Sequence, residues 1–154
     1  MIAALLKAHP YEEVAYDIVS LDNAFQNVGS GMVGNLKSPL DELTFLKSLK
    51  KSLKTDSIRY TKLLGKKVKR VAVCGGSGRF LLNNAIGAHA DAFITGDFKY
   101  HDFFDADNKI LVADVGHYES EQFTKELLLR HLSEKFPILA ARISSVNTNP
   151  IKYL

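Results

Sequence analysis

The 154-residue sequence predicts an α/β protein with a mainly parallel or mixed sheet and helices on its faces. Three strand–helix units in succession support this prediction. Short apolar runs at residues 71–74, 92–94 and 110–113 are typical of buried strands, and each is followed by polar residues and a helical stretch. Because such units join parallel strands by right-handed crossovers, the three strands should lie in one sheet.

The composition fits one folded chain with a sizeable core, since 46% of the residues are hydrophobic and the net charge is only +3. The single cysteine, Cys74, cannot form an internal disulfide and is typical of a reducing compartment, so we expect a cytoplasmic protein. No apolar stretch approaches the ~20 residues of a membrane span, and no membrane partner is expected.

Basic residues concentrate between residues 47 and 70, where Asp56 is the only acid. A surface for nucleic acid would need aromatic residues repeatedly interleaved with the basic ones as stacking platforms, and this stretch lacks that pattern. A solvated helix face followed by a polar loop explains the charges better. Nucleic acid is therefore not an expected partner.

The first part of the chain predicts a helix, two strands and a second helix. Residues 1–8 are rich in Ala and Leu and stop at His9-Pro10, as the end of a helix would. The alternation in 11–21 predicts a half-exposed strand, and 32–36 a short strand returning beside it. The next helix should begin at Ser38-Pro39-Leu40-Asp41, with Ser38 as the N-cap, and end near Leu53.

Weaker patterns complete the prediction. A strand is expected near 58–60, a short helix at 98–104 and a long helix from Tyr118 to about Lys135. A last strand is expected at 138–143, and residues 147–150 read as a turn.

Ligands of open α/β sheets bind beyond the carboxyl ends of the strands, so a functional site is expected where the three units turn from strand to helix. This edge brings together Gly75, Gly76, Ser77 and Gly78 from the first unit, Thr95, Gly96 and Asp97 from the second, and Asp114, Gly116 and His117 from the third.

His117 and Glu121 are the strongest candidates for chemistry. If a helix begins near Tyr118, they lie one turn apart and could hold a metal ion between imidazole and carboxylate. A helix N-terminus would also keep His117 neutral, the form that binds metal. The alternative is that His117 only caps the helix and the nearby acids only complement its dipole.

Two other histidines have the same spacing to an acid. Pro10 argues against a helix between His9 and Glu13, so a polar turn is favoured there. Asp97, His101 and Asp105 follow one another at four-residue steps, and the helix starts at the binding edge. Surface pairing is nevertheless favoured over metal ligation for His101 and Asp105.

The glycine-rich segment Gly75-Gly76-Ser77-Gly78 follows a strand and could present backbone amides to an anion. Close packing in a tight turn is the alternative. The segment completes neither G-x-G-x-x-G nor a Walker motif, so a classical dinucleotide or ATP site is not expected. Cys74, at the end of a buried strand, is expected to be inert.

Five motifs, in order along nearly the whole chain, resemble the C-terminal part of the YbgI/YqfO-like dinuclear-metal family, whose members are usually named GTP cyclohydrolase type 2 homologues or Nif-three-like proteins. The motifs are His9-Pro10-Tyr11-Glu12-Glu13-Val14-Ala15-Tyr16-Asp17, Gly75-Gly76-Ser77-Gly78, Thr95-Gly96-Asp97-Phe98-Lys99-Tyr100-His101, Gly116-His117-Tyr118-Glu119-Ser120-Glu121 and Asn147-Thr148-Asn149-Pro150.

The resemblance implies a domain division and a site. Residues 1–37 would be the tail of a CutA/PII-like insert domain, and 38–154 the C-terminal half of the dinuclear-metal α/β domain. His117 and Glu121 correspond to the family's C-terminal metal ligands. Asp97, His101 and Asp114 are candidates to orient these ligands by contacts that do not reach the metal itself. The family assembles as toroidal hexamers, so self-association into a homohexamer is implied.

The family's other ligands, two adjacent histidines and an aspartate, come from its N-terminal half, and this chain contains no His-His pair. We therefore expect a fragment that binds metal weakly or not at all, whereas an intact protein would hold two divalent ions (Zn, Fe, Mn or Mg). Two functions remain open. One is a metal-dependent hydrolase acting on a nucleotide or other phosphorylated small molecule; the other is a regulatory or scaffold protein with structural metals.

Overall fold

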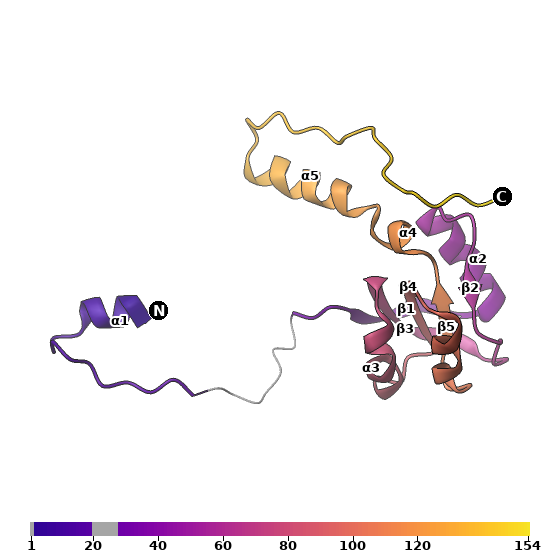
Figure 1. Cartoon of the computed structure of the whole chain (residues 1–154), viewed down its shortest axis with the longest axis horizontal. Coiled ribbons are helices and arrows are strands. Elements are labelled where there is room, and N and C mark those ends of the chain that lie inside the picture. Colours follow the sequence, from indigo (N-terminus) through magenta and orange to yellow (C-terminus); the bar gives the residue numbers. More distant parts are fainter. Residues whose placement is uncertain (1, 20–27) are drawn as a thin grey trace.

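The computed structural model describes residues 2–19 and 28–154, and its centre is a five-stranded mixed sheet in the order β1-β3-β4-β5-β2 (Figure 1). The strands are β1 (Met32–Asp41), β2 (Arg59–Tyr60), β3 (Lys67–Ser77), β4 (Ala92–Gly96) and β5 (Leu111–Asp114). β3, β4 and β5 are parallel, while β1 and β2 pair antiparallel at the two edges. The predicted α/β class and the three parallel strands are confirmed.

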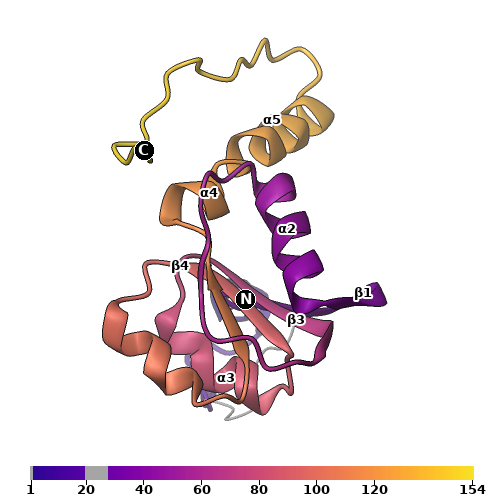
Figure 2. The same ribbon diagram turned by 90° about the vertical axis from the view of Figure 1, so that its right-hand side faces the viewer.

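Helices cover both faces of this sheet, as Figure 2 shows for α2 and α3. The helices are α1 (Ile2–Ala8), α2 (Glu42–Leu53), η1 (Arg79–Leu81), α3 (Leu82–Gly87), η2 (Tyr100–Ala106), α4 (His117–Glu121) and α5 (Thr124–Lys135). On one face, Phe45 and Leu46 of α2 pack in a cluster with Leu111 of β5. On the other, Leu82 of α3 packs in a cluster with Phe93 of β4.

The two central strands β4 and β5 consist only of buried residues. Parallel strands covered on both faces lose the polar–apolar alternation of a half-exposed strand, which is why both read as short continuous apolar runs in the sequence. Because the backbone of such strands is fixed by neighbours on all sides, the residues that follow them are held in well-defined places.

The predicted start of α2 at Ser38 is wrong, because residues 38–41 still belong to β1. Leu40 pairs with Val68 and Asp41 with Lys67 in the β1–β3 ladder, after an irregularity that accommodates Pro39 near the sheet edge. Strand pairing thus overrides the capping pattern. The helix begins at Glu42, whose buried carboxylate accepts hydrogen bonds from the amides of Leu64 (2.8 Å) and Gly65 (2.9 Å). Its end at Leu53 is as predicted.

The N-terminal helix is confirmed as α1, but the strand predicted at 11–21 is wrong over the residues described, since 11–19 form no strand. Residues 20 and 21 lie outside the described part. The strand predicted at 32–36 exists within β1, where it pairs with β3. β1 therefore crosses the predicted domain boundary after residue 37, and the insert domain stays a prediction without support from this sheet.

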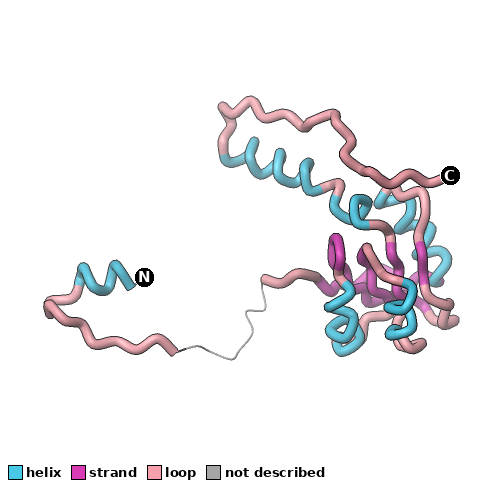
Figure 3. The backbone as a smooth tube through the Cα atoms, in the orientation of Figure 1, coloured by secondary structure: helices cyan, strands magenta, loops and turns pink. Residues whose placement is uncertain are grey.

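The long helix predicted from Tyr118 to Lys135 is two helices, α4 and α5, separated by Gln122 and Phe123. The strand predicted at 138–143 is wrong, because residues 136–154 form no helix or strand (Figure 3). They pair with no strand of the described chain, so nothing holds their backbone extended in a ladder. None of the described helices is long and apolar enough to cross a membrane.

Candidate metal site

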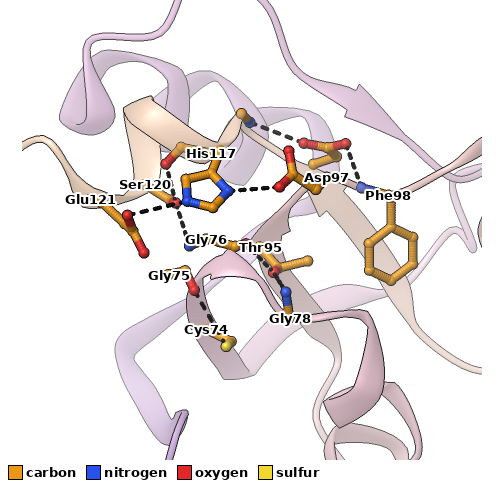
Figure 4. A network of polar contacts seen from close by, with 12 residues as sticks. Cys74, Gly75, Gly76, Gly78, Thr95, Asp97, Phe98, His117, Ser120 and Glu121 are labelled. Carbon is orange, nitrogen blue, oxygen red and sulfur yellow. Dashed lines mark hydrogen bonds and ion pairs between the residues drawn. The ribbon is translucent and has the colours of Figure 1, made fainter. Parts of the chain in front are cut away.

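The predicted site residues Asp97, His117 and Glu121 meet at the carboxyl edge of the sheet, and Figure 4 shows the imidazole of His117 between the two carboxylates. Asp97 directly follows β4, and His117 and Glu121 are the first and last residues of α4. His117 Nδ1 lies 2.6 Å from Asp97 Oδ2, and His117 Nε2 lies 3.3 Å from Glu121 Oε2. All three side chains are about half exposed, so a ligand can reach them.

Asp97 fixes the orientation and the proton affinity of the ring. Its hydrogen bond to Nδ1 raises the pKa of His117 above the ordinary value of 6.5, against the opposing effect of partial burial. This shift is opposite in direction to the one expected from the helix N-terminus, because a carboxylate in direct contact outweighs the weak dipole of a five-residue helix. With Nδ1 bonded to Asp97, Nε2 is left facing Glu121.

Asp114 holds together the loop that carries Asp97 and the loop that carries His117. It is buried, its Oδ1 accepts the amide of Gly116 (3.0 Å), and its Oδ2 accepts the amide of Phe98 (3.0 Å). Phe98 follows Asp97 and Gly116 precedes His117, so the Asp114 carboxylate fixes the backbone next to each of these two site residues. Arg59 from β2 forms an ion pair with the same carboxylate.

The glycines of β3 allow α4 to approach the sheet closely. Residues 75–77 belong to β3 itself rather than to a loop. Gly76 has a φ of +65°, and a Cβ there would lie 2.6 Å from Glu121 Oε1. The amide of Gly76 donates to Ser120 Oγ (2.8 Å) and that of Gly78 to Thr95 Oγ1 (2.9 Å).

Two of the four amides in Gly75-Gly76-Ser77-Gly78 therefore already have acceptors within the protein. Anion binding by this segment stays a prediction. The close-packing alternative describes what these glycines do in the structure.

His101 does not contact His117 or Glu121. It contacts the rings of Tyr100 and Phe104 on η2, and Asp105 pairs with Arg79 instead of with His101. η2 is a 3₁₀-helix, in which residues four apart are not on one face, so the predicted pairing fails. His9 lies in a turn, where Nδ1 accepts the amide of Tyr11 (3.2 Å), in agreement with the favoured interpretation.

Cys74 is buried, and burial is the main cause that raises the pKa of its thiol, with the charge of Glu121 adding to it. Its Sγ lies 3.2 Å from the carbonyl oxygen of Ser30. A neutral, buried thiol is a poor nucleophile. The structure therefore agrees with an inert cysteine.

Three further residues that contribute to the site, Ser120, Glu119 and Arg59, are not predicted as site residues by the sequence. Ser120 Oγ accepts the amide of Gly76 and donates to the carbonyl of His117 (2.7 Å), so it connects β3 to α4. Ser120 and Glu119 lie within the motif that contains His117, and this position is the one feature of the sequence that connects them to the site. Nothing in the sequence around Arg59 connects it to Asp114, 55 residues later.

The spacing of His117 and Glu121 suits a shared ion. Zinc binds imidazole nitrogen and carboxylate oxygen at about 2.1 Å, so two ligands of a tetrahedral ion lie about 3.4 Å apart; Nε2 and Oε2 are 3.3 Å apart. A carboxylate behind the histidine, as Asp97 is here, is the usual support of a metal-binding imidazole. In the described ranges 2–19 and 28–154, no group of three or more such side chains is arranged around one position. His117 and Glu121 are thus two candidate ligands without a third beside them in the described part of the chain.

Comparison with known proteins places the chain in a family. The chain is similar to the GTP cyclohydrolase 1 type 2 homolog of Bacillus subtilis (strain 168), with 36% identity over 160 residues that cover 100% of this chain and 42% of that protein. The protein of the same name from Staphylococcus epidermidis (strain RP62A) is 36% identical over 157 residues, covering 97% and 42%. The chain thus spans about two fifths of the length of these curated relatives.

Solved structures agree with the sequence comparison. A Bacillus cereus protein related to NIF3 superposes with a TM-score of 0.72 at 34% identity, covering 99% of this chain and 43% of that one. Staphylococcus aureus protein SA1388 superposes with a TM-score of 0.78 at 27% identity, covering 99% and 51%. Residues 1–150 match the family described as Duf34/NIF3 (NGG1p interacting factor 3). The resemblance drawn from the five motifs is confirmed, and the chain belongs to the DUF34/NIF3 family.

Proposed function

We propose that His117 and Glu121 supply two ligands of a divalent-metal site whose other ligands come from elsewhere in the complete protein. The observation that carries this proposal is the 3.3 Å separation of Nε2 and Oε2, with Asp97 holding the opposite side of the ring. Asp97 sets the tautomer and direction of the imidazole, as supporting carboxylates do for metal-bound histidines. The relatives, more than twice as long as the matched region, have room for further ligands.

We further propose that this site serves a metal-dependent hydrolase acting on a nucleotide or other phosphorylated small molecule. His117 and Glu121 line a pocket of about 740 Å³ together with Lys125 and Arg142. Neither of these cations has an ion-pair partner within the described residues, so both are free to meet an anionic group. A bound divalent ion would supply Lewis-acid activation of water or of a phosphoryl oxygen.

The residues of this chain would orient rather than react. Asp97 holds the ring, Glu121 and His117 Nε2 converge from one face of α4, and Lys125 and Arg142 neutralise the substrate anion. A regulatory or scaffold protein with structural metals is the competing role. The adjoining pocket with its two cations favours the hydrolase, because a catalytic ion needs space beside it for water and substrate whereas a structural one does not.

Calorimetric titration with Zn²⁺ tests the ligand assignment. Two protein ligands should give weak binding to this chain, and both H117A and E121Q should lower the affinity by about tenfold or more, because each removes a direct ligand. His131 provides a matched control, since it lies on α5 with Glu134 3.7 Å away and is comparably exposed. H131A should bind Zn²⁺ as the wild type does. Equal losses in H117A and H131A would show that Zn²⁺ binds surface histidines without preference, and the assignment would be wrong.

A further inference from the structure

The C-terminal motif Asn147-Thr148-Asn149-Pro150 contacts α4. Asn149 Nδ2 donates a hydrogen bond to Glu119 Oε1 over 3.1 Å. Glu119 is only 5% exposed, although it carries a carboxylate, and it stands between the proposed ligands His117 and Glu121. A buried carboxylate needs hydrogen-bond donors to offset its lost hydration, and Asn149 supplies one from 30 residues away.

The motif itself is folded so that this donor points the right way. Asn147 Oδ1 accepts the amide of Asn149 (2.9 Å), and Asn149 Oδ1 accepts the amide of Ile151 (3.1 Å). These are two successive Asx turns, and Pro150, the middle residue of the second, has a restricted φ. Because the oxygen of the Asn149 side chain is used by Ile151, its nitrogen is the atom left to face Glu119.

Glu119 in turn fills the space beside Gly116, the residue before His117. Gly116 has a φ of +93°, and a Cβ built on it would lie 2.1 Å from Glu119 Oε2. The carboxylate therefore lies between the Asn149 amide on one side and the Gly116 backbone on the other. This turn sets the direction in which His117 leaves β5 and α4 begins.

We propose that Asn149 is a positioning residue for the His117 and Glu121 pair and acts through Glu119. The C-terminal motif is then part of the site rather than a loose end, which explains why Asn149 and Pro150 line the same pocket as His117 and Glu121. Its bearing on metal affinity rests on the proposed function, while its effect on the α4 turn does not.

A donor–acceptor exchange tests the proposal. N149D places a second carboxylate against Glu119, so the two should repel and the α4 turn should loosen. In the double variant E119Q/N149D the amide of Gln donates to the new carboxylate, whose other oxygen can still accept the amide of Ile151. The contact is restored with donor and acceptor exchanged. N83D is the matched control, because Asn83 is an exposed residue of α3.

Two measurements are made on all variants at neutral pH. Amide hydrogen exchange of residues 117–122 should accelerate about tenfold in N149D, return to within about threefold of the wild type in E119Q/N149D, and stay unchanged in N83D. Zn²⁺ affinity should fall about tenfold in N149D and recover in the double variant. Recovery in the double variant is a result that a general loss of stability would not produce.

The contrary results are equally distinct. Unchanged exchange in N149D would overturn the positioning role, and accelerated exchange without recovery in E119Q/N149D would show that Asn149 does not act through Glu119. If the exchange results are as expected but H117A binds Zn²⁺ as tightly as the wild type, the positioning role stands and the proposed metal site fails.

Discussion

The imidazole of His117 owes its properties to a residue that precedes it by 20 positions in the chain. Asp97 adopts a φ of +58° at the end of β4, a backbone conformation that is uncommon for an L-residue and that aims its carboxylate at Nδ1. Strained backbone of this kind is concentrated at functional sites, where surrounding contacts hold it in place. Asp114 provides those contacts by accepting the amide of Phe98.

The variant D97N should lower the pKa of His117 toward 6.5, because its main cause of elevation is the hydrogen bond to the Asp97 carboxylate. Because the pKa of His117 is higher in the folded wild type than in the unfolded chain, the contact between protonated His117 and Asp97 stabilises the folded state. This contribution is fully present below pH 6.5 and is lost as the pH rises through the folded-state pKa. With chelator present, the melting temperatures of wild type and D97N should differ more at about pH 5.5 than at about pH 9.

NMR titration of the His117 ring measures the pKa directly. D56N, which alters an exposed acid on another loop, should leave both the ring pKa and the melting difference unchanged. A His117 pKa that is the same in D97N and wild type would contradict the assigned cause.

At the scale of single residues, the sequence predicts which side chains lie at the site better than it predicts the contacts between them. His117, Glu121, Asp97 and Asp114 could be placed at one sheet edge because each follows a predicted parallel strand. The direction in which the pKa of His117 shifts could not be predicted, since it depends on a contact with the Asp97 carboxylate between two loops. The roles of Glu119 and Arg59 also depend on contacts between distant segments.

Among the elements, the approach of α4 to β3 decides whether the site can form. Gly76 leaves the space into which Glu121 and the His117 ring project, with both within 3.3 Å of where a Cβ would stand. Its amide also donates to Ser120. A glycine within a strand often marks such a close approach, and here, near the end of β3, the approaching group is one of the proposed ligands.

The variant G76A should lower the free energy of unfolding by about 2–4 kcal/mol, because Ala is strained at positive φ and its methyl group collides with Glu121. It should also displace Glu121 and weaken Zn²⁺ binding. G87A is the matched control, since a Cβ at Gly87 meets nothing within 4 Å and the φ of this residue is not positive. Chemical denaturation of both variants provides the measurement. Wild-type stability and Zn²⁺ affinity in G76A would show that α4 is not held against β3.

Element boundaries followed the sequence where local patterns agreed with tertiary pairing and departed where they did not. The cap at Ser38 was overridden by the pairing of Leu40 and Asp41 with β3. The alternating pattern predicts a strand at 11–21, but its described part, 11–19, finds no partner strand, and a strand needs one to be stable. The buried runs of β4 and β5 were recognisable because their environment is apolar on both sides.

Over the whole molecule, burial is unevenly distributed. β4 and β5 contain no exposed residue, whereas α5 contains no buried one, and residues 136–154 have no regular structure. Local opening costs least where few apolar contacts are made. The chain therefore combines a firm sheet, which carries Asp97 and His117, with an accessible C-terminal arm that carries Asn149.

Limited digestion with trypsin should reveal this division. Cleavage after Lys135 and Arg142 should precede cleavage after Lys67 or Lys109, because nicking requires a segment that can enter the protease. Mass spectrometry of early fragments identifies the order, and early cuts within residues 67–114 would contradict it.

The accessible arm has a practical consequence for preparations of this protein. A molecule clipped after Lys135 would keep the sheet and every helix of the described chain, so its circular dichroism would closely resemble that of the intact chain. It would nevertheless have lost Asn149 and with it the donor to Glu119. Intact mass should therefore be verified before a low metal content is attributed to the ligands themselves.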